Sequence, residues 1–332
     1  MARRRTALSA AALALAIALA AAGCSSSGGK KTEEKDTADA VNGAGTPQLT
    51  IAMVTHSGEG DTFWDIVQKG AKQAAAKDNV KFLYSNNKEG NEQAQLVQTA
   101  IDQKVDGIIV TLAKPEALKA VLRKAVQAGI PVVSINSGSQ FSAAYGALSH
   151  IGQDEAVAGE AVGEEMAKRG LKKALCVIHE QGNVSLEERC AGAAKTFKGS
   201  MQKLYVTGTN MPDVLSSVTS KLQADKTIDA VLTLGAPFAA TSVQAVKATG
   251  AKVEVDTFDL NAAVVKQLKS KEVGFAVDQQ PYLQGYLAVD ELWLYRTNGD
   301  VIGGGRPVLT GPALVTEKDV PQLEKYTQRG TR

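Results

Sequence analysis

The chain has 332 residues, of which 44% are hydrophobic and 22% are charged, and its formal net charge is +2. This composition is ordinary for a globular protein, and the length is sufficient for two domains. Arg3, Arg4 and Arg5 are the only charged residues before Cys24, and removing them changes the formal charge from +2 to −1. The composition therefore indicates no basic surface for nucleic acid.

Residues 1–23 have the features of a secretory signal peptide. Three arginines are followed by an apolar run from Ala10 to Ala22, which is too short to span a membrane comfortably. The sequence AAGC, ending at Cys24, resembles a bacterial lipobox, which implies cleavage before Cys24 and a diacylglycerol on its sulfur. Ala21 stands where the lipobox usually has leucine, and ordinary signal cleavage nearby is the alternative. The arginines would also suit the twin-arginine export route.

Residues 24–48 predict a disordered tether. They are rich in Ser, Gly, Lys, Glu and Asp and contain almost no apolar residues, so they cannot bury enough surface to fold. With a lipid on Cys24, the resemblance implies a protein anchored to the bacterial cell membrane and facing the extracytoplasmic space.

The two remaining cysteines form an even pair in an oxidising compartment, which favours a disulfide. Cys176 lies in an apolar run, 174–178, that predicts a strand, and Cys190 lies in the predicted helix that follows. A strand and the next helix pack face to face, so a Cys176–Cys190 bridge is reasonable if the Cα atoms come within about 7 Å. Two buried free thiols are the alternative.

The stretch from Leu49 to Ala76 predicts a strand, a tight loop and a helix. An apolar run ends at Val54, a glycine-containing turn follows, and Asp61 or Thr62 is a plausible N-cap for a helix with apolar residues at helical spacing. The loop would lie at the carboxyl edge of a parallel sheet, where such folds bind ligands. It lacks the glycines of a dinucleotide-binding loop, and the chain contains no phosphate-binding P-loop.

Strand and helix patterns then alternate to the end of the chain. This alternation predicts an α/β protein with parallel sheets covered by helices on both faces, in two doubly wound lobes. In the first series we expect strands at 49–54, 80–84, 107–110 and 131–135, and helices near 63–77, 91–104 and 115–128. In the second we expect helices at 153–168, 185–198, 213–224, 237–249, 260–269 and 282–297, and strands at 174–178, 203–207, 229–234, 252–257 and 273–277.

From Leu49 to about Val315 the chain resembles the periplasmic sugar-binding proteins of bacterial ABC importers, of the ribose/galactose type. That fold is shared with the effector domain of lactose-repressor-type regulators. The motifs that carry the resemblance are DTFW, GIIVTLAKPEAL, AGIPVVSINSG, SHIGQDEAVAG, LEERCAG, DAVLTLGAPFA and TFDLNAAVVKQLKSKEVGFAVDQQPYLQGY.

The resemblance implies two lobes joined by a three-segment hinge, with the ligand in the cleft between them. The N-terminal lobe would comprise 49–151 plus 280–308, and the C-terminal lobe 152–279 plus 309–320. The crossovers would lie near 150–154, 279–281 and 303–310.

The same resemblance implies a set of ligand-binding residues. Phe63 and Trp64 match the family's stacking pair, and Asp61 stands where the family usually has asparagine. Asn136 and Ser137 end the fourth strand, where many relatives have Asp-Arg. This departure replaces two charged groups by neutral ones, so the hydroxyl pattern recognised should differ from that of ribose.

Three further positions match the second lobe and the hinge: Arg189, Asp259 and Gln279. Two of them have a local alternative: Asp259 could only cap the following helix, and Arg189 could pair with Glu187 or Glu188 on a solvated face. Gln279 and Gln280 form a hinge-like sequence before Pro281, in which Gln280 could serve only the backbone. Asp154 fits a helix N-cap and a cleft residue equally well. Gly235 stands where relatives often have a polar contact, and His179 and Glu180 could reach the ligand.

No pattern in the sequence indicates catalysis, a metal or a cofactor. A nucleophile elbow and His ligands at metal-binding spacing are both missing from the sequence. The resemblance therefore implies a monomeric lipoprotein that captures a monosaccharide or polyol and delivers it to an ABC permease in the membrane. A sensor of the same fold that acts on a membrane receptor is the main alternative. A transcriptional regulator is disfavoured by the leader and by the lack of a helix-turn-helix segment, and a secreted enzyme is a more distant alternative.

Overall fold

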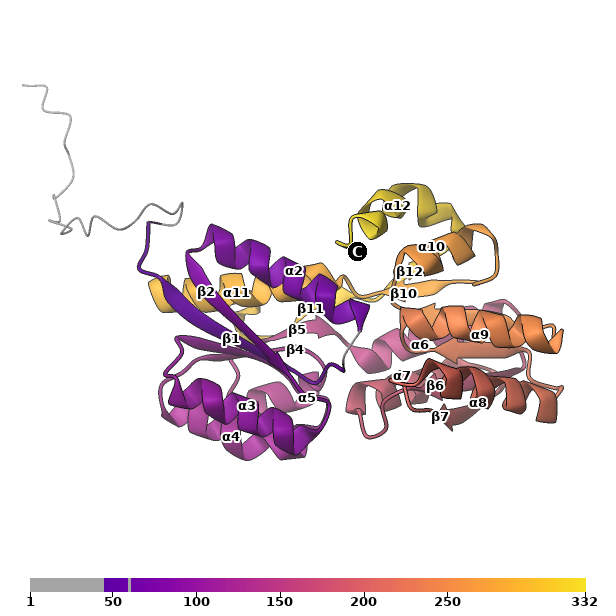
Figure 1. Cartoon of the computed structure of the whole chain (residues 1–332), viewed down its shortest axis with the longest axis horizontal. Coiled ribbons are helices and arrows are strands. Elements are labelled where there is room, and N and C mark those ends of the chain that lie inside the picture. The colour runs from indigo at the N-terminus through magenta and orange to yellow at the C-terminus, as the bar shows by residue number, and fades with distance from the viewer. Residues whose placement is uncertain (1–44, 59–60) are drawn as a thin grey trace, which may run out of the picture. The chain divides into compact units, whose positions relative to one another are not determined.

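The computed structural model describes residues 45–58 and 61–332 (Figure 1). The predicted signal peptide, the lipidation of Cys24 and residues 24–44 of the predicted tether lie outside the described residues. In the part that the structure describes, each of two lobes contains a central sheet with helices on both faces. The predicted α/β fold with two parallel-sheet lobes is confirmed.

The first sheet has the strand order β11-β5-β4-β3-β1-β2, and its pairings are all parallel. β1 lies between β2 and β3, with Met53 opposite both Tyr84 and Ile109. The strands are β1 (Leu49–Thr55), β2 (Val80–Asn86), β3 (Gly107–Thr111), β4 (Val132–Asn136), β5 (His150–Gln153) and β11 (Val308–Gly311).

Successive residues of β1 point to opposite faces of this sheet and enter different cores. Ile51 and Met53 pack under α2 (Thr62–Lys77) and α11 (Pro281–Asn298). Ala52 and Val54 pack under α3 (Gly90–Asp102) and α4 (Pro115–Gln127). This two-sided burial explains why the strand is a continuous apolar run. A short helix, α5 (Ser139–Ser142), and a 3₁₀ turn, η1 (Ala143–Tyr145), precede β5.

The second sheet repeats this arrangement in the order β12-β10-β9-β8-β6-β7, but its last strand, β12, runs antiparallel to β10. α6 and α7 cover one face, and α8, α9 and α10 cover the other. The strands are β6 (Lys173–Ile178), β7 (Ser200–Tyr205), β8 (Ala230–Thr233), β9 (Glu254–Phe258), β10 (Ala276–Asp278) and β12 (Ala313–Val315). The helices are α6 (Glu155–Lys168), α7 (Val184–Thr196), α8 (Met211–Ala224), α9 (Ala236–Thr249), α10 (Ala262–Lys269) and α12 (Val320–Gln328), with 3₁₀ turns η2 (Ile302–Gly305) and η3 (Glu317–Asp319).

The chain passes between the sheets three times: from β5 to α6, from β10 to α11 and from β11 to β12. The lobe boundaries expected at 151/152 and 308/309 fall inside β5 and β11. In the structure both strands belong wholly to the first sheet, so the chain leaves the first lobe two to three residues after each expected boundary. The sequence pattern also omitted α12 and the strands β5, β11 and β12, and these three strands, of three or four residues, are too short to show a period.

Glycines set the closest approach of helices in both lobes. A Cβ atom on Gly285 of α11 would lie 2.0 Å from the carbonyl oxygen of Val67 in α2, and one on Gly70 would lie 2.0 Å from that of Tyr282. α6 and α7 meet in the same way at Gly159 and Gly192. α11 is therefore held directly against α2 after the second crossover, which fixes one end of the hinge.

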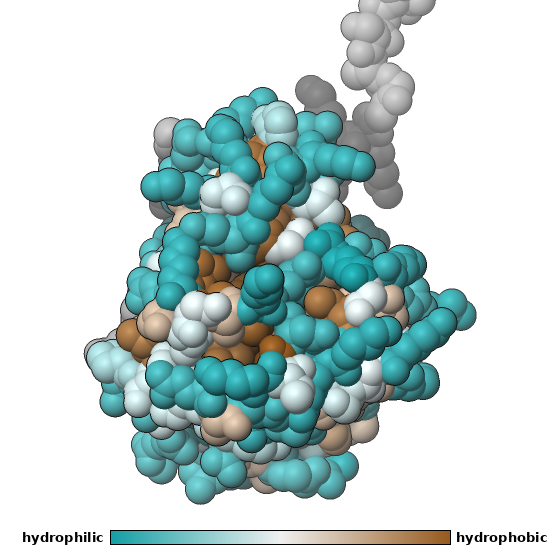
Figure 2. Space-filling view, turned by 90° about the vertical axis from the view of Figure 1, so that its right-hand side faces the viewer, coloured by the Kyte–Doolittle hydropathy of each residue, from teal (hydrophilic) through white to brown (hydrophobic). Residues whose placement is uncertain are grey.

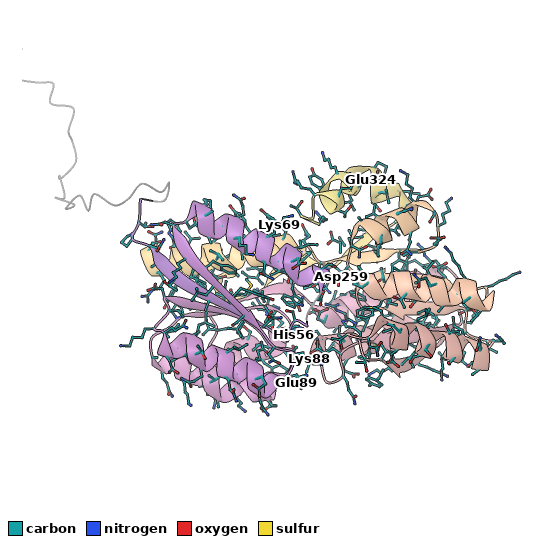
Figure 3. All side chains as sticks on the ribbon, in the orientation of Figure 1. His56, Lys69, Lys88, Glu89, Asp259 and Glu324 are labelled. Atoms are coloured by element: carbon teal, nitrogen blue, oxygen red, sulfur yellow. A yellow bond between two sulfur atoms is a disulfide. The ribbon has the colours of Figure 1, made fainter. Side chains whose placement is uncertain are left out.

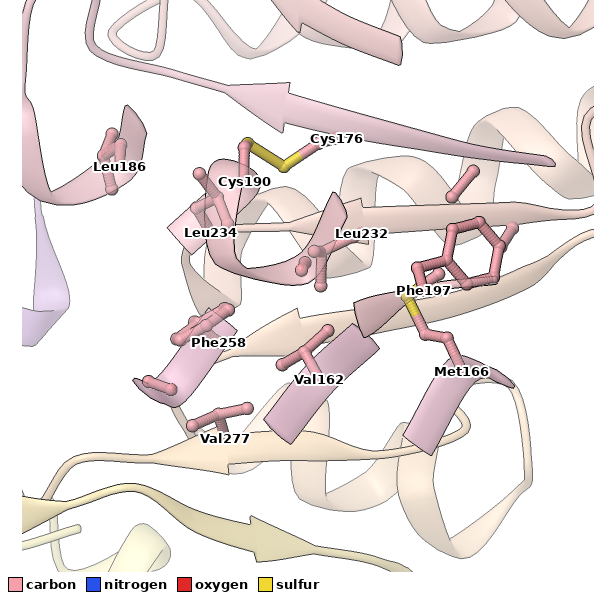
Figure 4. Packing of buried hydrophobic residues seen from close by; sticks show 14 of the residues in the cluster. Val162, Met166, Cys176, Leu186, Cys190, Phe197, Leu232, Leu234, Phe258 and Val277 are labelled. Carbon is pink, nitrogen blue, oxygen red and sulfur yellow. A yellow bond between two sulfur atoms is a disulfide. The ribbon is translucent and has the colours of Figure 1, made fainter. Parts of the chain in front are cut away.

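The predicted disulfide between Cys176 of β6 and Cys190 of α7 is present, with a Cα–Cα distance of 6.0 Å. Both cysteines are buried, and Figure 4 shows the bridge beside Leu234 in the core of the second lobe. The bridge fixes α7 onto the sheet near the residues that face the cleft.

The end of the molecule shown in Figure 2 is mostly hydrophilic, with hydrophobic residues visible between polar side chains. Among residues 45–58 and 61–332, no helix has both the length and the apolar character needed to cross a membrane.

Candidate functional site

A cavity of about 840 Å³ lies between the two lobes and is lined by residues of both. Most of its polar lining comes from segments that follow β1, β4, β6 and β9, so it lies at the carboxyl edges of the two sheets. In Figure 3, His56 and Asp259 mark the region where the two lobes meet. Of the eight residues predicted to bind ligand, seven line this cavity: Asp61, Phe63, Trp64, Asn136, Arg189, Asp259 and Gln279.

The loop after β1 contributes an aromatic wall. Asp61 caps α2, since its carboxylate accepts a hydrogen bond of 3.0 Å from the backbone N–H of Phe63. The rings of Phe63 and Trp64 meet edge to face with centroids 5.1 Å apart, and His56 meets Trp64 in the same way at 5.1 Å. Both aromatics also pack against the core below α2. They therefore serve the core and the cavity together.

A chain of hydrogen bonds connects the lobes at the cavity. Asn136 Nδ2, at the end of β4, donates to Gln279 Oε1 at 3.1 Å, and Gln279 Nε2 donates to Asp259 Oδ1 at 2.7 Å. All three side chains are buried. Asn136 and Asp259 have φ angles of 61° and 70°, a conformation rare outside glycine, and such strain is concentrated at functional sites. Gln279, in the second crossover, therefore connects Asn136 of the first lobe to Asp259 of the second through hydrogen bonds.

Arg189 forms its ion pair with Glu155 and not with Glu187 or Glu188, which are its neighbours in the sequence. Its Nε and Nη2 donate to the carboxylate of Glu155 at 2.6 and 2.9 Å, and its Nη1 donates to the carbonyl oxygen of Leu234 at 3.3 Å. The guanidinium also lies 4.6 Å from the ring centroid of Phe258. Pairing with Glu187 or Glu188 on a solvated face is wrong, because Arg189 is buried. Three of its five N–H groups are used, which leaves two for a ligand.

Asp154 is not part of the cavity. It is exposed and caps α6 by accepting a hydrogen bond of 3.0 Å from the N–H of Val157, so the structure supports its capping role and does not bring it to the other seven residues. The neighbouring Glu155 points inward instead. Neighbouring side chains on a helix point to different faces. The sequence pattern could not show which of Asp154 and Glu155 points inward.

Residues of the two lobes also contact each other directly. Asn183 of the second lobe lies 3.2 Å from His56 Nε2, and Glu180 lies 3.6 Å from the same atom. The backbone N–H of Val184 donates to the carbonyl oxygen of Ala113 at 3.1 Å. These contacts are those of a closed arrangement. Nothing in the sequence marked Asn183 or His56 as contact residues beyond their positions after predicted strands.

Residues 51–299 match the family model described as periplasmic binding protein domain. The chain belongs to the periplasmic binding protein family. The type I architecture, with two parallel-sheet lobes, agrees with this membership.

This periplasmic binding protein is similar to several described proteins. A solved carbohydrate transporter from Acidothermus cellulolyticus, in complex with myo-inositol, is 50% identical with a TM-score of 0.85, and the match covers 86% of this chain and 100% of that one. The xylose/arabinose-binding protein XylF of Sulfolobus acidocaldarius is 25% identical over 68% of this chain, which spans only 60% of XylF. The ribose import binding protein RbsB of Haemophilus influenzae is 26% identical over 75% of this chain and 86% of RbsB. These relatives are named as transport or binding proteins and not as enzymes.

The carboxyl groups of the cavity have raised pKa values. Burial raises the pKa of Asp259 to about 7, although Arg189 and the hydrogen bond from Gln279 oppose the rise. Burial likewise raises the pKa of Asp61 to about 6, against the hydrogen bond from Phe63 N–H. Burial lowers the pKa of His179 to about 3 and that of His56 below its usual value, so both imidazoles are neutral at pH 7. Within the described parts of this binding protein, no group of three or more His, Cys, Asp or Glu could hold a metal ion.

The raised pKa of Asp259 predicts a pH-dependent stability. The folded state binds this proton more tightly than the unfolded chain, so the stabilisation is full below the unfolded pKa, near 4, and is lost as the pH rises through about 7. We expect Asp259→Asn to flatten the fall in Tm of the ligand-free protein over that range. The exposed Asp154→Asn should keep the wild-type slope, and equal slopes for all three proteins would contradict the expectation.

Proposed function

We propose that this protein captures a small sugar or cyclic polyol between its lobes and delivers it to the permease of an ABC importer. The observation that carries the proposal is the chain Asn136–Gln279–Asp259, which brings polar groups of both lobes and the hinge to one cavity. A ring with hydroxyls on its edge and C–H groups on its faces needs such amide and carboxylate partners together with an aromatic wall.

The side chains that line the cavity favour a cyclic polyol over ribose. Asn136 and Ser137 are neutral, and Phe63 and Trp64 supply the apolar faces. The relative with 50% identity was solved with myo-inositol, whose ring carries a hydroxyl on every carbon. That relative supports an inositol-like ligand for this chain.

Capture would work by lobe closure. Asp61 and Asn136 belong to one lobe, and Arg189 and Asp259 to the other, so only the closed state offers all four to one ligand. A ligand that binds the closed state better shifts the open–closed equilibrium toward it, and a shift from mostly open to mostly closed needs about 5.5 kcal/mol of differential affinity. Several shared hydrogen bonds can supply that energy. The short crossover segments would act as hinges.

The lipid anchor and the permease complete the proposal. A diacylglycerol on Cys24 and a tether over 24–48 would keep the closed, loaded protein, as a monomer, close to a membrane partner. Relatives named as import binding proteins support a transport role.

Isothermal titration calorimetry on the purified protein tests this function. We expect saturable binding of myo-inositol and at least tenfold weaker binding of ribose. The variant Asp259→Asn should weaken binding, and the matched control Asp154→Asn, outside the cavity, should not. The proposal fails if none of a panel of monosaccharides and polyols binds.

A further inference from the structure

The charges around the cavity do not balance within the protein. In the part of the chain that the structure describes, the cationic residues that line the cavity are Lys88, Lys114 and Arg189. Arg189 already forms a bidentate ion pair with Glu155, at 2.6 and 2.9 Å, in which the side chains are 4% and 3% exposed. A pair this well matched is neutral as a unit. It therefore offers hydrogen-bond donors to a ligand, and Glu155 offsets part of the positive charge that Arg189 presents to Asp259.

Two carboxylates face the same cavity with no cation of their own. Asp259 accepts one hydrogen bond, from the neutral amide of Gln279, and Asp61 accepts one, from the backbone N–H of Phe63. Among residues 45–58 and 61–332, neither carboxylate forms an ion pair within 4.0 Å. Asp259 is 8% exposed, and its Oδ1 accepts the hydrogen bond from Gln279 Nε2. Because both carboxylates line the cavity, a ligand bound there can supply the cation that neither of them has within the protein.

The other cations at the cavity do not supply this partner. Lys114 lies 3.8 Å from Glu89 and 3.9 Å from Glu180. Its side chain also donates to the carbonyl oxygen of Lys88 at 2.7 Å, so it is directed toward the surface loops. In Figure 3, Lys88 and Glu89 lie at the lower edge of the region between the lobes, apart from Asp259.

We propose that the preferred ligand is a polyol that carries a protonated amine, with its ammonium group bound by Asp61 and Asp259. This inference rests on the proposed function and narrows its ligand class. The ammonium supplies three N–H donors, which match the free carboxylate oxygens of the two lobes. Asn136, Gln279 and the two remaining N–H groups of Arg189 are left for the hydroxyls. Phe63 and Trp64 add aromatic rings beside the charge, an arrangement that favours a cation.

The pKa shifts of the two carboxyls agree with this assignment. Burial raises the pKa of both, and the charge of Asp61 adds to the rise at Asp259. A bound ammonium would reverse these shifts, because an opposite charge nearby favours the carboxylate. Amine binding near pH 7 should therefore release protons, and binding of an uncharged polyol should not.

The test compares matched ligand pairs by calorimetry at pH 7: myo-inositol with an aminodeoxy-inositol, and glucose with glucosamine. We expect the amine of at least one pair to bind at least tenfold more tightly than its hydroxyl partner, with proton release measured in buffers of different ionisation enthalpy. Asp259→Asn should reduce that preference to less than twofold, Asp61→Asn should reduce it partly, and Asp154→Asn should leave it unchanged.

Each other outcome has a defined meaning. If myo-inositol binds and both amines bind equally or more weakly, this inference is overturned while the proposed function stands. If an amine is preferred but Asp259→Asn keeps the preference, the assignment of the ammonium to Asp259 is overturned. If none of the four ligands binds, this inference is overturned, and if the wider panel of monosaccharides and polyols also fails to bind, the proposed function fails as well.

Discussion

Replacing Arg189 by alanine is expected to lower ligand affinity more than tenfold and the free energy of unfolding by about 3–5 kcal/mol. Both effects have the same origin. The substitution leaves the carboxylate of Glu155 buried with only the hydrogen bond from Gln153, at 2.8 Å, and it removes the two N–H groups available to a ligand. Chemical denaturation measures the loss of stability, and calorimetry on the remaining folded protein measures the loss of affinity.

A double variant separates these effects. Glu155→Gln combined with Arg189→Met removes both charges and keeps the volume, so it should recover at least about 1 kcal/mol of the lost stability, since well-packed neutral replacements of buried ion pairs are tolerated. It should not recover affinity. If Arg189→Ala binds ligand normally, Arg189 is no part of the site and only positions α7.

Removing the disulfide is expected to cost about 3 kcal/mol of stability, because the bridge closes a loop of about 15 residues in the unfolded chain. The sequence separation of Cys176 and Cys190 is 14. In the variant Cys176→Ala/Cys190→Ala, each kcal/mol should lower Tm by about 2–4 °C for a chain of this size. Ligand affinity should change much less, since the Glu155–Arg189 pair still connects α6 to α7.

The oxidised wild-type protein and a reduced sample provide the control. Reduction after unfolding should bring the wild-type denaturation midpoint close to that of the double-alanine variant, and reductant should leave the variant unaffected. Equal stability of oxidised protein and variant would show that the bridge adds nothing to the folded state.

Local patterns predicted the longer strands and helices, and the resemblance supplied the candidate site residues. Buried parallel strands are continuous apolar runs, and polar residues at their ends, such as Asn136 at the end of β4 and Asp259 after β9, lie at the carboxyl edges of the two sheets. The resemblance supplied the reason to choose Arg189 over its neighbours. It could not exclude Asp154, which has the sequence features of a cap and of a cleft residue alike.

The sequence by itself determined the alternation of strands and helices, the cysteine pair and the positions at which polar groups leave the strands. Only the tertiary structure decided which charges meet. Glu155 pairs with Arg189 across 34 residues, and Asn183 reaches His56 across 127. The physical reason is that periodicity is a local property of the chain, whereas desolvation and ion pairing depend on which distant segments bury one another.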